Sequence, residues 1–186
     1  VINSGAQQII SGGVGLSTTV NSGGQQVLFG GSSLNASIGS GAQQVLFGGS
    51  SLGASISSGG QQTVSGGAAI STIVSGSGVE LVSSGGIVSN TIVMSGGLLE
   101  LFSGAQIRGN LTISVGATLE IASGYTLGGW SVSSGTLVQV LSGGIVSGGT
   151  LISGGVLQIQ AGGSALSERI ASGVNFIVSS GVYVSG

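Results

Sequence analysis

Short runs of alternating apolar and polar residues recur along the chain at an interval near nineteen residues. The runs, aligned on the residue that opens each one, start at Ser4, Ser22, Ser40, Ser58, Ser75, Ser95, Val115, Ser134, Ser153 and Ser172, with spacings of 17 to 20 residues. A nearly fixed period of this size is the signature of a solenoid, in which each repeat buries its apolar side against the next. The sequence therefore predicts about ten stacked coils of 17–20 residues.

The alternation within each run has the two-residue period of a strand. The sixth residue after each start is aliphatic and is expected to point inward: Ile10, Leu28, Leu46, Val64, Leu81, Leu101, Ile121, Val140, Ile159 and Val178. The fifth becomes polar midway and is expected to face water: Ile9, Val27, Val45, Thr63, Glu80, Glu100, Glu120, Gln139, Gln158 and Ile177. Gly-Gly pairs such as Gly30-Gly31 separate the runs, and glycine suits tight corners because it reaches positive φ freely. An all-β fold, a parallel β-helix, follows.

The fourth residue after each start is glutamine in the first four repeats, at Gln8, Gln26, Gln44 and Gln62. The same position holds Val or Leu in most later repeats, so the glutamines are expected to point inward or to line a corner. Amides stacked at strand spacing can each donate to the next. We therefore predict an amide ladder that satisfies buried polar groups.

Composition narrows the possible functions. The chain has 41 Gly among 186 residues, yet 40% of its residues are hydrophobic and only 3% are charged, unlike a disordered chain. Its only cations are Arg108 and Arg169, and its net charge is −2, which argues against nucleic-acid binding. No apolar run is long enough to span a membrane. Because His, Cys and Asp are absent, no catalytic base, thiolate or zinc set is available, and we expect neither an enzyme nor a cofactor.

Glu80, Glu100 and Glu120 occupy the same predicted outward position in three consecutive repeats. Their carboxylates could form a cation site, since Ca²⁺ takes several carboxylate oxygens. The alternative is a solvated acidic stripe with side chains splayed apart, and the sequence favours this stripe.

Val27, Phe29, Val45 and Phe47 are expected to lie together on the outer surface, because each Phe stands two residues after its Val. Exposed apolar patches usually mark contact surfaces. A corner of the chain, or a neighbouring segment, could instead cover this patch.

The segments "VNSGGQQVLFGGSSLNASI" and "SSGGIVSNTIVMSGG" resemble the repeats of AIDA-type self-associating autotransporter adhesins, a family that includes the Tib adhesin/invasin. The likeness is close over residues 1–100 and looser over residues 101–186, where the coils are less regular. It implies that residues 1–186 are one right-handed β-helical segment of a longer passenger domain. It also implies export through the outer membrane to the bacterial cell surface, adhesion to host cells and autoaggregation.

The resemblance further implies covalent O-linked heptose, added to Ser or Thr by a bacterial heptosyltransferase. The family pattern favours the serines that open the repeats, followed by two serines before the opposite Gly-Gly pair: Ser4, Ser22, Ser40, Ser58, Ser95, Ser134, Ser153, and then Ser11 and Ser65. The leading hypothesis is a non-enzymatic adhesin segment. The alternative is a passive stalk or an acceptor substrate, with adhesion located elsewhere in the full-length protein.

Overall fold

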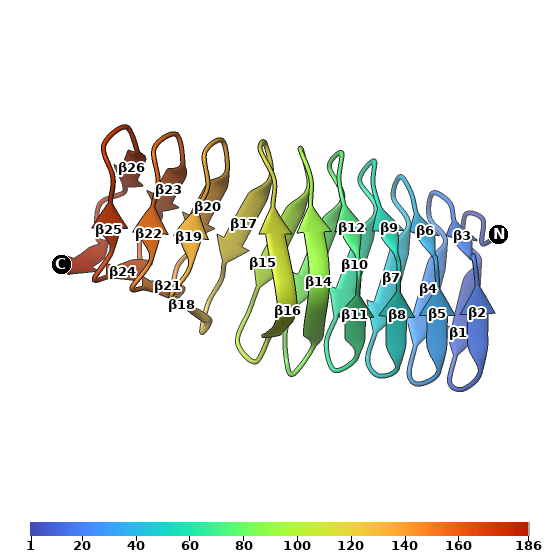
Figure 1. Ribbon diagram of the computed structural model, residues 1–186. Coiled ribbons are helices and arrows are strands. Elements are labelled where there is room, and N and C mark those ends of the chain that lie inside the picture. The colour runs from blue at the N-terminus through green and yellow to red at the C-terminus, as the bar shows by residue number, and fades with distance from the viewer. Residues whose placement is uncertain (186) are drawn as a thin grey trace.

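The protein is a rod of stacked parallel strands, seen in a computed structural model that describes residues 1–185 (Figure 1). Each coil contributes one strand to a first wall and one or two strands to a second wall. Across the described residues the secondary structure is β-strand and turn, with no helix. The prediction of an all-β parallel solenoid is confirmed.

The first wall is a single sheet that runs through the whole rod. Its strands pair in chain order and in parallel, one strand from each coil. They are β1 (Gln7–Ile10), β4 (Gln25–Leu28), β7 (Gln43–Leu46), β10 (Gln61–Val64), β13 (Val79–Val82), β15 (Leu98–Leu101), β17 (Thr118–Ile121), β20 (Leu137–Val140), β23 (Val156–Ile159) and β26 (Asn175–Val178).

The second wall is divided along the rod. Its N-terminal part is one sheet, in which two rows of short strands merge at β14 and continue to β16. These strands are β2 (Val14–Leu16), β3 (Thr19–Val20), β5 (Ser32–Leu34), β6 (Ser37–Ile38), β8 (Ser50–Leu52), β9 (Ser55–Ile56), β11 (Ala68–Ile70), β12 (Ile73–Val74), β14 (Ile87–Val93) and β16 (Gln106–Ile113).

The C-terminal part of the second wall consists of two smaller parallel sheets. One contains β18 (Thr126–Gly128), β21 (Ile145–Ser147), β24 (Ser164–Leu166) and β27 (Tyr183–Ser185). The other contains β19 (Ser131–Val132), β22 (Thr150–Leu151) and β25 (Arg169–Ile170). No strand pairing joins β16 to β18 or β19 in the described chain, so the second wall is interrupted there (Figure 1). A cavity of about 580 Å³ lies at this interruption, lined by Leu111, Trp130 and Val138 among others.

The register of the fifth coil differs from the sequence prediction. β10 pairs with β13 so that Gln62 stands opposite Glu80 and Val64 opposite Val82. The chain there reads Ser75-Gly76-Ser77-Gly78, which offers two Ser-Gly dipeptides, and the corner forms at Gly76 and Ser77, with φ of 50° and 68°. The fifth repeat therefore starts at Gly76 rather than Ser75. The expected inward position of Leu81 is wrong, and Glu80 and Val82 point inward instead.

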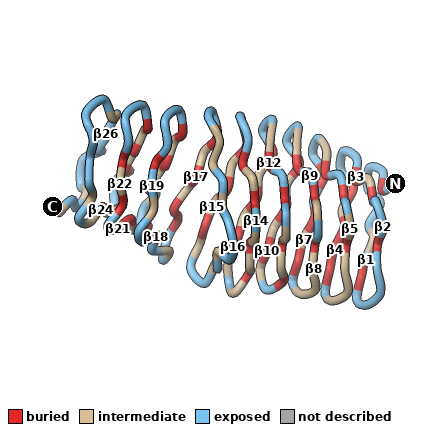
Figure 2. Tube along the Cα trace, in the orientation of Figure 1, coloured by how far each residue is buried: buried red, intermediate tan, exposed pale blue. Residues whose placement is uncertain are grey.

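The core is a narrow apolar layer between the two walls. Inward residues are buried along most of the rod, and outward residues alternate with them (Figure 2), but β16 and the last three strands, β25, β26 and β27, contain no fully buried residue. Leu28, Leu46, Val64 and Val82 form one such column, because parallel register places each above its counterpart in the previous coil. Burial of these side chains stabilises each coil only through its neighbours.

The predicted amide ladder is present inside the rod. The Nε2 of Gln26 donates to Oε1 of Gln8 at 2.7 Å, the Nε2 of Gln44 donates to Oε1 of Gln26 at 2.5 Å, and Gln62 donates to Gln44 in the same way. Hydroxyls of Ser33 and Ser51 also donate to Oε1 of Gln26 and Gln44, at 2.9 and 3.0 Å. Gln26, Gln44 and Gln62 are fully buried, so these bonds replace the solvation that the amides lose.

A second amide ladder runs along the outer side of the same strands. Gln7 donates to Gln25 at 2.5 Å, and Gln25 donates to Gln43 at 3.2 Å. These side chains are exposed or half-buried, and water can replace their hydrogen bonds.

We predict that Gln44→Ala lowers the free energy of unfolding by about 2–4 kcal/mol, because it removes the partners of Gln26 and Gln62 and leaves a cavity. Gln43→Ala, on the outer face of the same strand, is the matched control and should change the free energy by less than about 0.5 kcal/mol. Urea unfolding followed by circular dichroism measures both. Equal effects of the two substitutions would contradict a structural role for the inner ladder.

Candidate functional site

A line of exposed serines runs along the corner that precedes the first wall. Each serine is the first residue of a two-residue turn. Every member of the preferred acceptor set is exposed there: Ser4, Ser22, Ser40, Ser58, Ser95, Ser134 and Ser153. Gly76 and Val115 hold the same turn position in the two intervening coils. The structure thus brings all seven predicted acceptors onto one edge of the rod.

Glycine keeps the hydroxyls of this line accessible. The turn residue after the serine in the next coil is Gly23, Gly154 or Gly173, each with φ between 71° and 81°. A Cβ at Gly154 would lie 2.5 Å from the Oγ of Ser134, and a Cβ at Gly173 would lie 2.8 Å from the Oγ of Ser153. A larger residue would be strained and would also cover the hydroxyl below it.

Ser11 and Ser65 lie on a different line, directly after β1 and β10. Ser11 is exposed, whereas Ser65 is half-buried and its hydroxyl donates to the carbonyl oxygen of Leu46 at 3.4 Å. Phe29 and Phe47 occupy the same position in the two coils between them, as their backbone hydrogen bonds to the previous coil show. The two secondary acceptors therefore border the aromatic pair and do not extend the main serine line.

A second line of turn serines was not predicted from the sequence. It follows the corner after the first wall in the C-terminal half of the rod, and its members are all exposed: Ser84, Ser103, Ser123, Ser142 and Ser180. A Cβ at Gly143 would lie 2.8 Å from the Oγ of Ser123, so the local geometry repeats that of the first line. The signal is a Ser-Gly dipeptide that recurs at intervals of 19 or 20 residues from Ser84 to Ser142 and returns at Ser180, with Ala161-Gly162 at the intervening turn.

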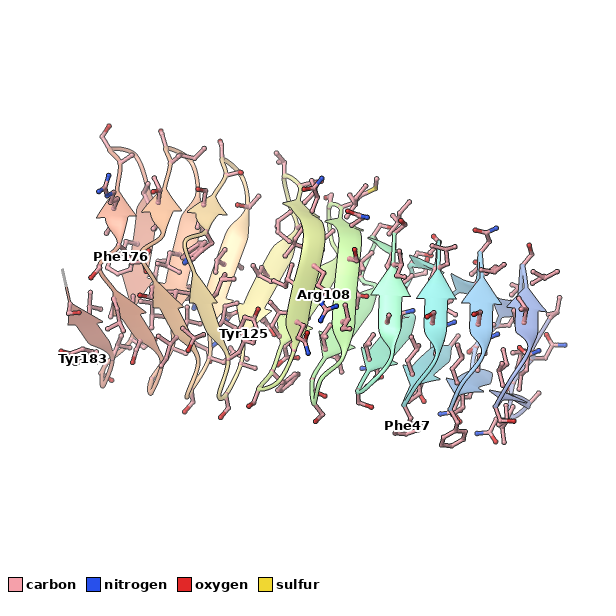
Figure 3. All side chains as sticks on the ribbon, turned by 60° about the horizontal axis from the view of Figure 1, so that its bottom comes forward. Phe47, Arg108, Tyr125, Phe176 and Tyr183 are labelled. Carbon is pink, nitrogen blue, oxygen red and sulfur yellow. The ribbon has the colours of Figure 1, made fainter. Side chains whose placement is uncertain are left out.

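The predicted apolar patch is smaller than expected. Phe29 and Phe47 are 57% and 53% exposed, and their rings stack with centroids 5.3 Å apart and planes 14° apart. Phe47 lies at the outer margin of the rod (Figure 3). Val27, however, is only 6% exposed, and Val45 is half-buried, so the expected exposure of Val27 is wrong. Val27 stands between Ile9 and Val45 in the ladder, and in-register stacking covers it from both sides.

A second apolar ladder lies on the outer face of the second wall. Leu16, Leu34, Leu52 and Ile70 are Cα partners in successive strands, and Leu16 and Leu52 are 68% and 42% exposed. This ladder was not predicted from the sequence, although an apolar residue three places after each of the first four Gly-Gly pairs marks it. The rod therefore presents apolar surface on both walls in its N-terminal half.

Glu80 does not share the outward column of Glu100 and Glu120. Its strand partner is Gln62, and Glu100 stands opposite Leu81. Glu80 is completely buried, and burial raises the pKa of its carboxyl from an ordinary 4.5 to about 8. The predicted three-membered acidic stripe is wrong, because the shifted register turns Glu80 into the core.

Glu100 and Glu120 remain partners on the outer face of the first wall. Partial burial raises the pKa of both carboxyls, and the charge of Glu120 raises that of Glu100 further. Within residues 1–185 no group of three or more His, Cys, Asp or Glu side chains is arranged to hold a metal ion. The outer face of the first wall therefore carries two stacked carboxylates, Glu100 and Glu120, instead of the three predicted from the sequence.

Stacked coils with exposed serine corners and apolar outer ladders define a parallel β-helical rod. Among solved structures, the chain is similar to a TibC-catalysed hyper-glycosylated fragment of TibA, with 29% identity and a TM-score of 0.58. The likeness covers 99% of this chain and 82% of that fragment. It supports an autotransporter-adhesin-like β-helical segment. No protein-family model and no curated protein matches the chain.

The described part of the chain also contains no helix that could cross a membrane.

We predict that Glu120→Gln lowers the pKa of Glu100, because it removes one of the two causes that raise it. The pKa should stay above 4.5, since partial burial of Glu100 persists. An NMR pH titration of the Glu100 carboxyl carbon measures the change. Glu168→Gln, in a distant coil, is the control and should leave Glu100 unaffected; an unchanged pKa in Glu120→Gln would contradict coupling of the stacked pair.

Proposed function

We propose that the chain is a non-enzymatic adhesive segment of a bacterial surface protein, exported through the outer membrane. In this proposal the rod holds its contact surfaces away from the cell and binds host cells or other copies of itself. The observation that carries it is the likeness, along nearly the whole chain, to a hyper-glycosylated TibA fragment of the same β-helical form.

The proposal includes O-linked heptose on the turn serines, added by a bacterial heptosyltransferase. The serine oxygen would attack the anomeric carbon of an activated sugar, whose leaving group departs while the serine proton passes to the transferase. Support comes from the exposure of the seven first-line serines and from the glycines that leave the hydroxyls of Ser4, Ser95, Ser134 and Ser153 open. The second line, Ser84 to Ser180, has the same turn geometry and is included among the candidate acceptors.

A passive stalk is the second candidate. The first wall is one unbroken sheet through all its strands, and such a sheet suits a spacer that carries an adhesive region elsewhere in the full-length protein. The two candidates differ in whether the outer apolar residues of this segment contact other surfaces.

We expect intact mass spectrometry of the segment, produced together with a heptosyltransferase, to show a series of heptose-sized additions that are absent without the enzyme. Replacing the seven first-line serines by alanine should lower the number of these additions, and fragmentation should place those that remain on the second line or on Ser11 and Ser65. Ser37→Ala with Ser55→Ala is the matched control, because these serines are exposed but lie within strands. A bare polypeptide under both conditions would overturn the acceptor proposal and favour an unmodified stalk.

We expect Phe29→Ser with Phe47→Ser to reduce clumping of cells that display the protein, because it removes the stacked aromatic surface. The fold should survive, since both rings are more than half exposed. Leu16→Ser with Leu52→Ser, on the other wall, is the control for general loss of apolar surface. Sedimentation of the cells measures clumping, and an unchanged rate in the phenylalanine variant would contradict contact through this pair.

A further inference from the structure

The inner amide ladder stops at Gln62, and its last acceptor atom lacks a partner. Oε1 of Gln26 and of Gln44 accepts from the glutamine of the next coil and from a serine hydroxyl of its own coil. At Gln62 both donors have been replaced: Ala69 stands where Ser51 stands one coil earlier, and Glu80 follows where a glutamine would. Oε1 of Gln62 is buried without a hydrogen-bond partner.

Glu80 faces this orphan acceptor from the next strand. Its side chain has the same length as glutamine, and three preceding rungs show that side chains of this length meet across the strand spacing. Both of its carboxyl oxygens are buried and also lack a partner. An ionised carboxylate could only accept, so it would place two acceptors together with no donor between them.

No charge compensates Glu80 among the described residues around it. The inward residues of the neighbouring strands and corners are uncharged and do not titrate near neutral pH: Gln62, Ala69, Thr72, Val88, Thr91 and Leu99. Arg108 and Arg169 are exposed, and Glu100 and Glu120 stand on the outer side of their strands. A buried carboxylate without a counter-charge is strongly disfavoured relative to its neutral acid.

We propose that Glu80 is held as a neutral carboxylic acid whose hydroxyl donates to Oε1 of Gln62, so that it ends the amide ladder as a mimic of glutamine and makes the middle of the rod sensitive to pH. The hydroxyls of Thr72 and Thr91 are buried and unpartnered in the same two coils. Thr91 occupies, in the coil of Glu80, the register position from which Thr18 reaches Oε1 of Gln8 at 3.5 Å in the first coil, and in this proposal Thr91 donates to the carbonyl oxygen of the acid. With Glu80 neutral, its two carboxyl oxygens and Oε1 of Gln62 all have hydrogen-bond partners within the protein. Ionisation of Glu80 removes the hydroxyl that donates to Gln62.

The direction of the pH dependence follows from linkage. The pKa of Glu80 is about 8 in the folded rod and near 4.5 in the unfolded chain, so the folded state holds one proton more between these values. This contribution to stability is complete below about pH 4.5 and is lost progressively as the pH rises to about 8. The unfolding constant should increase by as much as about tenfold per pH unit in this window.

Glu80→Gln tests the proposal, because glutamine supplies the donor without a titrating proton. We expect urea unfolding of the wild-type segment to become easier from about pH 5 to about pH 7.5, while Glu80→Gln loses most of this pH dependence. Glu100→Gln, which removes an outward carboxyl one coil away, should keep it. The proposal is overturned if Glu80→Gln retains the wild-type pH dependence.

A second measurement examines the folded protein directly. The chain has four Glu and no Asp, so ¹³C labelling of glutamate carboxyls gives four side-chain NMR signals. We expect one signal at the neutral-acid position at about pH 7, and we expect it to be absent in Glu80→Gln. Four ionised signals at that pH would overturn the proposal, even if the variant were too unstable for the unfolding experiment.

Discussion

Parallel, in-register stacking is the constraint on which the rest of this structure depends. Adjacent strands lie about 4.8 Å apart, and each side chain meets the residue at the same position of the next coil. A side chain is therefore tolerated only if it packs or bonds well with its counterpart. Valine, leucine and isoleucine meet this condition by close packing, and glutamine meets it because one amide carries both a donor and an acceptor. The Gln8–Gln62 column is thus compatible with a core only a few side chains wide.

The same constraint accounts for the scarcity of charge. A carboxylate or ammonium repeated at strand spacing would face a like charge in each neighbouring coil, and the chain accordingly has only six charged residues, two basic and four acidic. Glu100 and Glu120 are the one strand-paired set of like charges among the described residues, and each has a raised pKa. Polar character is supplied instead by serine and glutamine. The surface available for contact consequently carries little charge, with hydroxyls at the corners and apolar ladders on the walls.

The sequence predicted what recurs in every coil and failed where the repeat is ambiguous. The period, the strand alternation, the inward glutamines and the exposed corner serines all follow from local patterns that the structure repeats. The misplacement of Glu80 came from Ser75-Gly76-Ser77-Gly78, where two corners are equally plausible locally and only pairing with β10 decides between them. The burial of Val27 was missed for a related reason. Alternation predicts which face of the strand a side chain lies on, but its solvent exposure on that face depends on the residues eighteen positions before and after it.

The inward column that contains Gln62 is polar in the N-terminal half of the rod and apolar in the C-terminal half, and Glu80 lies at the boundary between them. Before it the column is made of amides that are bonded in series; after it the column is Leu99, Leu119, Val138, Leu157 and Phe176, which need no donor. A ladder of donors and acceptors must end somewhere, and an end next to leucine leaves either a donor or an acceptor unsatisfied. Because this ladder donates toward the N-terminus, its C-terminal end lacks a donor. A neutral acid provides that donor and itself presents little polar surface to Leu99. In a solenoid each coil is stabilised only by its neighbours. The free energy of the interface between the coils of Gln62 and Glu80 therefore affects whether the two halves of the rod unfold together.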